Sequence, residues 1–197
     1  MGRKADPARR KQLLVAIAAY LEEHGLAGLS LRPLGSAVGV SPRTLLYHFG
    51  SKEQLLAEAL NASPGLKAAV AEFVASGEPL FARMRTLWAR TADPGSRPYL
   101  RLFFEVYAAA LRDPRRYAAF LDGVVDGWLT LLVPMLEREG LARAPARTLA
   151  TELLALHHGC ALDLLATGDG TRVGAAYLAR VDEVEAAVQQ RRGRAKG

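Results

Sequence analysis

The sequence predicts an all-α protein with a small N-terminal domain and a larger second helical domain. Apolar residues recur at helical spacing along nearly the whole chain. No segment alternates between apolar and polar residues as a half-buried strand does, and the breaks are rich in Gly, Pro and Asp. The chain has 197 residues, of which 50% are hydrophobic and 23% charged, a composition typical of a globular protein of one or two domains.

Two helices are expected before residue 40. Asp6 and Pro7 supply an N-cap and a first-turn proline for a helix that ends near Gly25. Ser30 caps a short second helix. Gly39 can end that helix, because glycine adopts the left-handed conformation without a steric penalty.

A third and a fourth helix follow directly. The third begins with the Ser41 cap and ends after Phe49. Ser51 and, three residues later, Gln54 form a capping box, which opens a fourth helix that is predicted to reach Leu60.

The rest of the chain contains six further helical patterns, separated by segments with turn residues. They cover residues 65–75, 79–91, 98–112, 115–139, 145–167 and 172–190. We place the domain boundary where helix length and charge both change. Residues 1–63 are then expected to form one domain, and residues 64–197 a second, larger domain with a basic C-terminal tail.

Positive charge is concentrated at the two ends of the chain. Residues 1–60 contain eight Lys/Arg and five Asp/Glu, residues 61–188 contain fourteen and fifteen, and residues 189–197 contain four and none. An excess of positive charge near one end favours a polyanionic partner, most often nucleic acid. A basic tail alone is equally typical of a solvated chain end.

Cysteine content and hydropathy indicate the compartment. The single Cys160 cannot form an internal disulfide, and the N-terminus lacks the apolar core of a signal peptide. Uncharged apolar runs such as 127–136 end after ten residues, whereas a membrane span needs about 20. We therefore expect a cytoplasmic protein without a membrane-spanning helix.

Two short helices with a glycine-centred turn between them, Leu31–Val38 and Pro42–His48, fit a helix-turn-helix, whose second helix lies in the DNA major groove. Leu45 and Phe49 are spaced to face inward on this second helix. The polar residues between them form the other face. Lys52 lies in the first turn of the next helix, where it could help to hold a phosphate.

The stretch LSLRPLGSAVGVSPRTLLYHFGSKEQLL resembles the DNA-binding domain of the TetR family of bacterial transcriptional regulators. The resemblance covers about residues 8–60 and implies a dimer that reads a palindromic operator. The chain departs from the family at Leu46, where a phosphate-holding tyrosine is more usual, and at Gly35, where alanine is usual. Base or phosphate contacts are expected from Arg32, Ser41, Pro42, Arg43, Thr44, Tyr47, His48 and Lys52.

Large apolar side chains form stripes on three of the later helices. Small-molecule sites in helical proteins are mostly apolar with a few polar groups. We therefore expect an effector pocket between these helices, with His157 as a polar group in it, although a plain hydrophobic core would give the same pattern. The candidate ligand residues are Met84, Trp88, Phe103, Phe104, Tyr107, Trp128, Leu131, Met135 and His157.

The last two helical patterns predict a homodimer interface. Residues 145–167 are apolar on most sides, and residues 173–188 carry a narrow apolar seam. A helix that is apolar nearly all round is central or also packs against a partner. The two segments could pair across a twofold axis as a four-helix bundle, which the family resemblance also implies. The candidate interface residues are Leu154, Ala161, Leu165, Tyr177, Val181 and Val184.

No catalytic or metal-binding motif is recognisable. His157, His158, Cys160 and Asp163 include zinc-ligand types, but the two histidines point about 100° apart on a helix and no second cluster completes a site. We predict no metal, no cofactor and no enzymatic activity. The expected function is a ligand-responsive repressor, released from its operator by a small apolar or amphipathic molecule. The alternatives are a ligand-sequestering protein without specific DNA binding and a small helical enzyme.

Overall fold

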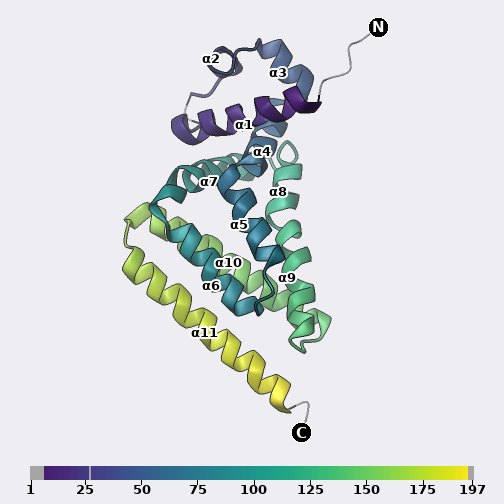
Figure 1. Ribbon diagram of the computed structural model, residues 1–197, viewed down its shortest axis with the longest axis vertical. Coiled ribbons are helices and arrows are strands. Elements are labelled where there is room, and N and C mark those ends of the chain that lie inside the picture. Colours follow the sequence, from purple (N-terminus) through teal and green to yellow (C-terminus); the bar gives the residue numbers. More distant parts are fainter. Residues whose placement is uncertain (1–6, 27, 195–197) are drawn as a thin grey trace. The chain divides into compact units, whose positions relative to one another are not determined.

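The computed structural model describes residues 7–26 and 28–194, and every regular element within these residues is a helix (Figure 1). The all-α prediction is confirmed. The chain forms two compact units. The N-terminal unit holds the described residues up to Ala68 together with Pro98–Leu121, and the C-terminal unit holds Ala69–Arg97 and the chain from Asp122 onward.

The N-terminal unit begins with the four predicted helices, and only their ends differ by a residue or two from the prediction. Asp6, the predicted first cap, lies outside the described residues. Ser30 precedes the second helix, but its side chain makes no capping hydrogen bond. The helices are α1 (Pro7–His24), α2 (Leu31–Ala37), α3 (Pro42–Phe49) and α4 (Lys52–Ala62).

The core of this unit lies between α1, α3 and α4. Ile17 and Leu21 from α1, Leu45 and Phe49 from α3, and Leu55 from α4 are all almost completely buried. Helix α1 packs on α4, and α3 packs on both α2 and α4. The apolar side of α3 is therefore fixed while its other side remains exposed.

Helix α7 (Arg97–Arg112) also belongs largely to the N-terminal unit. Its Glu105 carboxylate accepts a hydrogen bond from the backbone N–H of Leu26 at 2.6 Å, just beyond the end of α1. Gly25, at φ +68°, allows this approach, because a Cβ there would lie 3.1 Å from a Glu105 carboxylate oxygen. Arg116 adds an ion pair to Glu53 of α4 at 3.6 Å.

The remaining helices are α5 (Pro64–Ala75), α6 (Leu80–Ala92), α8 (Ala118–Val124), α9 (Asp126–Arg138), α10 (Arg143–Thr167) and α11 (Gly170–Arg194), with a 3-10 turn at Pro94–Ser96. The single helix expected over 115–139 is wrong: the structure has two, separated at Val125. The glycines at positions 123 and 127 and two adjacent valines are weak helix formers, and they surround this break.

The core of the C-terminal unit is built by α6, α9, α10 and α11. The last two helices form an antiparallel hairpin, closed by Gly168 in the left-handed conformation at φ +71°. Tyr177, Val181 and Val184 of α11 point into the core with Trp88 of α6. At the rim, Arg85 of α6 donates to carboxylate oxygens of Asp182 and Glu185 on α11.

Two stretches are long and apolar enough to cross a membrane, judged by length and composition only. They are residues 118–138, with mean hydropathy 1.5, and residues 143–167, with mean hydropathy 1.2. The short length of the uninterrupted apolar runs predicts no membrane-spanning helix. Helices α9 and α10 from these stretches pack against each other, and Leu132, Leu136 and Leu153 are core residues of the unit. Packing inside the protein therefore accounts for part of their apolar character, since 39% of the first apolar window and 28% of the second are buried.

Gly35 is a position where the fold requires glycine. A Cβ built there would lie 2.5 Å from the Val40 carbonyl oxygen, which is closer than the 3.0 Å that Cβ atoms keep from other heavy atoms. We expect Gly35→Ala to lower the free energy of unfolding by about 1–3 kcal/mol, because the turn between α2 and α3 must open. Urea unfolding measures this loss.

Gly123→Ala is the matched control, because a Cβ at that helical position meets nothing within 4 Å. It should leave stability unchanged or raise it by about 0.5–1 kcal/mol. Equal stability changes in the two variants would contradict the close approach of α2 and α3.

Candidate functional site

Helix α3 begins at a side-chain cap. The Ser41 hydroxyl accepts a hydrogen bond from the Thr44 N–H at 3.0 Å and lies 2.8 Å from the Thr44 hydroxyl. Pro42 occupies the first turn, where a missing N–H costs nothing. Ser41 and Pro42, both predicted to contact DNA, thus also fix the start of α3.

The outer face of α3 is exposed and polar. Arg43 is exposed, Thr44 is half-buried, and the Tyr47 side chain is 62% exposed. Leu46, which stands where the family more often has tyrosine, is 41% exposed and offers no hydrogen-bonding group. Among the predicted contact residues, α3 therefore presents a guanidinium, a hydroxyl and a phenol on one short helix.

His48 is turned partly toward the protein. Its ring lies 5.4 Å from the Tyr47 ring in an edge-on arrangement. The Nδ1 atom is buried and has no hydrogen-bond partner among the residues that the structure describes. Arg32, the predicted contact on α2, is exposed.

Lys52 is already engaged in the absence of DNA. Its ammonium group donates to the Leu29 carbonyl oxygen at 2.5 Å, which ties the start of α4 to the loop before α2. Ser51 caps α4 by accepting from the Gln54 N–H at 3.0 Å, while the Gln54 side chain donates to Glu58 instead of completing the capping box. A lysine has three donors, so two remain for a phosphate.

Sequence reasoning missed Arg10, which it counted only as one of the basic residues near the N-terminus. In the structure the Arg10 side chain reaches from α1 to the end of α3, where it donates to the His48 carbonyl oxygen. The contact joins residues 38 positions apart, and no local sequence pattern marks it.

Six of the predicted ligand residues lie in the C-terminal unit. Met84, Trp88 and Met135 are buried in its core, and His157 lies edge-on to the Trp88 ring at 6.0 Å. Trp128 is half-buried and packs edge-on against Phe73. The sixth residue is Leu131, which is also half-buried.

A directional chain of hydrogen bonds crosses this core. The Thr91 hydroxyl donates its proton to the Leu87 carbonyl at 2.9 Å, so it must accept at its 3.1 Å contact with His157 Nε2. His157 therefore carries its proton on Nε2, and Nδ1 accepts from the Tyr177 hydroxyl at 3.3 Å. Thr91 was not predicted, because one threonine in an apolar helix gives no signal.

Burial keeps this chain uncharged. Burial, together with the neighbouring His158, lowers the pKa of His157 to about 3. Burial, with a further contribution from Cys160, raises the pKa of the Tyr177 phenol above its ordinary value. At neutral pH the site therefore presents dipoles and aromatic rings rather than ions.

The other three predicted ligand residues belong to the N-terminal unit. Phe103, Phe104 and Tyr107 lie on α7, and their half-buried rings pack edge-on around Phe103. Phe120 of α8 closes this cluster, 5.8 Å from both Phe103 and Tyr107.

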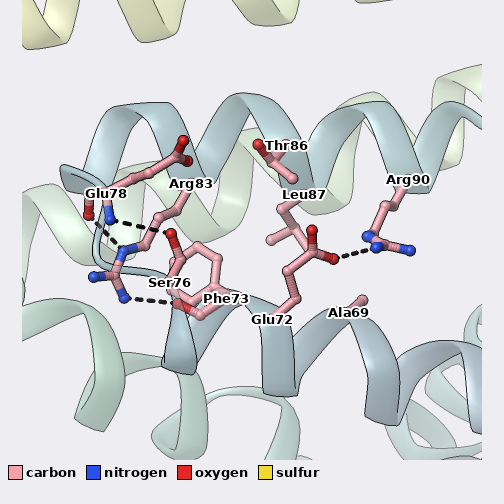
Figure 2. A pocket seen from close by; sticks show the side chains of 9 residues that line it. All are labelled: Ala69, Glu72, Phe73, Ser76, Glu78, Arg83, Thr86, Leu87 and Arg90. Carbon is pink, nitrogen blue, oxygen red and sulfur yellow. Dashed lines mark hydrogen bonds and ion pairs between the residues drawn. The ribbon is translucent and has the colours of Figure 1, made fainter.

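A hollow of about 280 Å³ opens between α5 and α6 (Figure 2). Its chemistry is polar: Glu72 pairs with Arg90 at one end, and at the other Arg83 donates to the carbonyl oxygens of Glu78 and Phe73. None of the predicted ligand residues lines it. The Arg83 guanidinium instead holds the turn between the two helices.

The predicted interface residues lie mainly inside a single chain. Tyr177, Val181 and Val184 are at most 6% exposed, and Ala161 is 2% exposed. Leu154 is buried and Leu165 half-buried. Periodicity identified a packing seam correctly, but the seam of α11 packs on α6 and α10 of its own chain.

Residues 13–59 match the sequence model of the bacterial regulatory proteins of the tetR family. The match contains α2, α3 and nearly all of α4. The chain carries a TetR-family DNA-binding domain. TetR-family proteins are DNA-binding regulators rather than enzymes.

Solved TetR-type structures share the whole fold, whereas no curated protein matches the sequence significantly. A proposed TetR-family regulator from Rhodococcus sp. aligns with a TM-score of 0.72 at 21% identity, covering 89% of this chain and 97% of its own. The multidrug binding protein EbrR, solved with imidazole, has 27% identity and a TM-score of 0.65, covering 92% and 93%. A proposed regulator from Saccharomonospora viridis, solved with choline, has 22% identity and a TM-score of 0.66, covering 90% and 95%.

The hydrogen-bond chain through His157 makes the stability of this protein sensitive to acid. The folded-state pKa of His157, about 3, lies below its ordinary 6.5, so its stabilising effect is complete above pH 6.5 and is lost as pH falls toward 3. Between pH 7.5 and 5.5 we expect the free energy of unfolding to fall by about 1.4 kcal/mol more in the wild type than in His157→Asn. Urea unfolding at the two pH values measures the difference.

The asparagine variant retains a donor and an acceptor but does not titrate, and His158 is present in both proteins. The same pH dependence in both would mean that His157 is accessible and protonates in the folded protein as it does in the unfolded chain.

Proposed function

We propose that this chain is a transcriptional repressor that binds a palindromic operator as a homodimer and leaves it when a small apolar or amphipathic molecule binds. The observation that carries the proposal is the geometry of α3. Leu45 and Phe49 anchor one side in the core, while Arg43, Thr44 and Tyr47 face outward. A helix held this way can enter a major groove without refolding.

Each predicted contact has a role that follows from its chemistry. Arg43 reads a base, because guanidinium groups pair bidentately with guanine. Thr44 lies one residue further along and contributes a hydroxyl to the same groove. Lys52 holds backbone phosphate together with the N-terminus of α4. These contacts position and specify each half-site.

The homodimer is proposed to form through the α10–α11 hairpin. Part of its outward surface consists of small apolar residues, and Leu162 among them is 51% exposed. Such surfaces let two helix pairs approach closely as a four-helix bundle. The exposed residues that make up this hairpin face are Ala155, Gly159, Leu162 and Ala166 of α10, and Ala175, Ala179 and Ala186 of α11.

The effector is proposed to bind at the aromatic residues of the two units. Trp88, Tyr177 and His157 combine ring faces with neutral hydrogen-bonding groups. The EbrR and S. viridis structures contain imidazole and choline, small molecules that combine a polar group with carbon–hydrogen surface, which supports the amphipathic part of the proposed class. An effector that favours another spacing of the two α3 helices, which must be about 34–36 Å apart on DNA, lowers operator affinity. A coupling of about 1–3 kcal/mol corresponds to roughly 5- to 150-fold release.

Selection from a randomised duplex pool at near-physiological salt tests the DNA-binding proposal. The wild type should enrich a palindrome. Arg43→Ala should relax the preference at one position of each half-site, whereas Lys52→Ala should weaken all sequences alike and reduce the salt dependence. Added choline, or a larger aromatic cation, should displace the selected duplex if the effector class is correct.

Absence of enrichment above non-specific DNA would overturn the repressor proposal and favour the ligand-sequestering alternative. An Arg43→Ala variant with unchanged sequence preference would reject base contact by Arg43 alone.

The hairpin face predicts the oligomeric state. Leu162→Glu should convert dimers into monomers in light scattering, because a desolvated carboxylate at the centre of a small interface has no partner. Leu111→Glu makes the same change at a 69% exposed leucine of α7 and should leave the dimer intact. If Leu162→Glu remains dimeric, the proposal that the hairpin face forms the dimer interface is rejected.

A further inference from the structure

Helix α3 is too short to hold its own orientation. It has eight residues, and isolated helices shorter than about 12 residues are marginal in water. The Ser41 cap fixes its beginning. At its end, Gly50 N–H donates to the Leu46 carbonyl and Ser51 N–H to the Phe49 carbonyl. The carbonyl of His48, which lies between these two in sequence together with that of Tyr47, is bound from outside the helix.

Arg10 supplies that bond with one edge of its guanidinium. Its Nε donates to the His48 carbonyl oxygen at 3.2 Å, and its Nη2 donates to the Glu58 carboxylate of α4 at 2.6 Å. Glu58 is held in turn by the Gln54 amide at 3.3 Å. One planar cation therefore joins α1, where it originates, to the end of α3 and to the middle of α4.

The same guanidinium also covers the core. Its central carbon lies 4.8 Å above the centre of the Phe49 ring, and that ring is only 1% exposed. A cation over a buried aromatic face is attracted by the ring, and a positive charge at a helix C-terminus is favoured by the helix dipole. The Arg10 side chain is itself 35% exposed. The contacts of Nε and Nη2 fix the guanidinium plane and therefore orient the remaining Nη1 group.

We propose that Arg10 is a positioning residue that sets the orientation of the reading helix α3, without itself contacting DNA. The inference rests on the proposed DNA-binding function. Without Arg10, α3 would remain anchored at Leu45 and Phe49 but could tilt about them. The side chains of Tyr47 and His48, near the C-terminal end of α3, would then no longer be held in one orientation.

The test compares three variants. Arg10→Met removes the planar donor group but keeps an unbranched apolar side chain, Arg10→Lys keeps the charge without the fork, and Arg9→Met removes the same charge from an exposed position one residue away. Hydrogen exchange of the α3 amides is measured first in the DNA-free protein. Affinity for the selected duplex is then measured across a range of salt concentrations.

Arg10→Met should speed exchange in α3 more than in α1 or α4. It should also lower duplex affinity about tenfold, as expected for a lost hydrogen bond to a charged group, with an unchanged salt slope. Arg10→Lys should recover only part of both effects. Arg9→Met should leave exchange unchanged. If Arg10→Met fails to fold, amide exchange and duplex affinity are compared in Arg10→Lys and Glu58→Gln instead.

A salt slope that falls by about 0.9 with unaltered exchange would overturn the proposal, because it would make Arg10 a phosphate ligand. Unchanged exchange and unchanged affinity would overturn it as well. If the wild type selects no duplex, the DNA-binding proposal fails, but the exchange measurements still decide whether Arg10 holds α3.

Discussion

The functional arrangement depends on one constraint, which is that an eight-residue helix must be held rigidly while most of its polar face stays free. Two buried side chains, Leu45 and Phe49, fix the distance of α3 from the core. Two apolar contacts along one line leave rotation about that line unopposed. The Ser41 cap stabilises the start of α3, whereas the Arg10 guanidinium contacts its end from α1 and opposes this rotation.

Local patterns in the sequence predicted helices α1 to α4 well, because the residues that begin, end and orient these helices lie within or next to them in the sequence. Caps, glycines and helical spacing fixed α1 to α4, and the polar face of α3 followed from the positions of Leu45 and Phe49. Contacts between distant residues were not predictable in this way. The Arg10 bond to the His48 carbonyl and the Thr91 bond to His157 join residues 38 and 66 positions apart, and no spacing rule reports such pairs.

The interface prediction shows what periodicity can and cannot specify. A repeat of apolar residues in α11 correctly indicates that one side is buried, but not which surface buries it. Val181 and Tyr177 pack on their own chain. The proposed hairpin face consists instead of alanines with Gly159 and Leu162, a composition that gives almost no amphipathic signal because alanine is neutral in hydropathy patterns. The prediction of a single helix over 115–139 was wrong for a related reason. The apolar pattern continues without interruption across the backbone break at Val125, so periodicity alone does not show the break.

The division of the chain into units separates the proposed effector residues into two groups, of which only one shares a unit with α3. Phe103, Phe104 and Tyr107 belong to the same unit as the reading helix, and Glu105, between them in sequence, bonds the backbone just after α1. A ligand that reorients α7 therefore acts on α1 through one carboxylate, and α1 carries Arg10. The His157 chain has no such direct link, because each of its groups already has a partner within the C-terminal unit. A ligand there must replace one of those hydrogen bonds to enter, so its polar groups must match a neutral donor and acceptor rather than an ion.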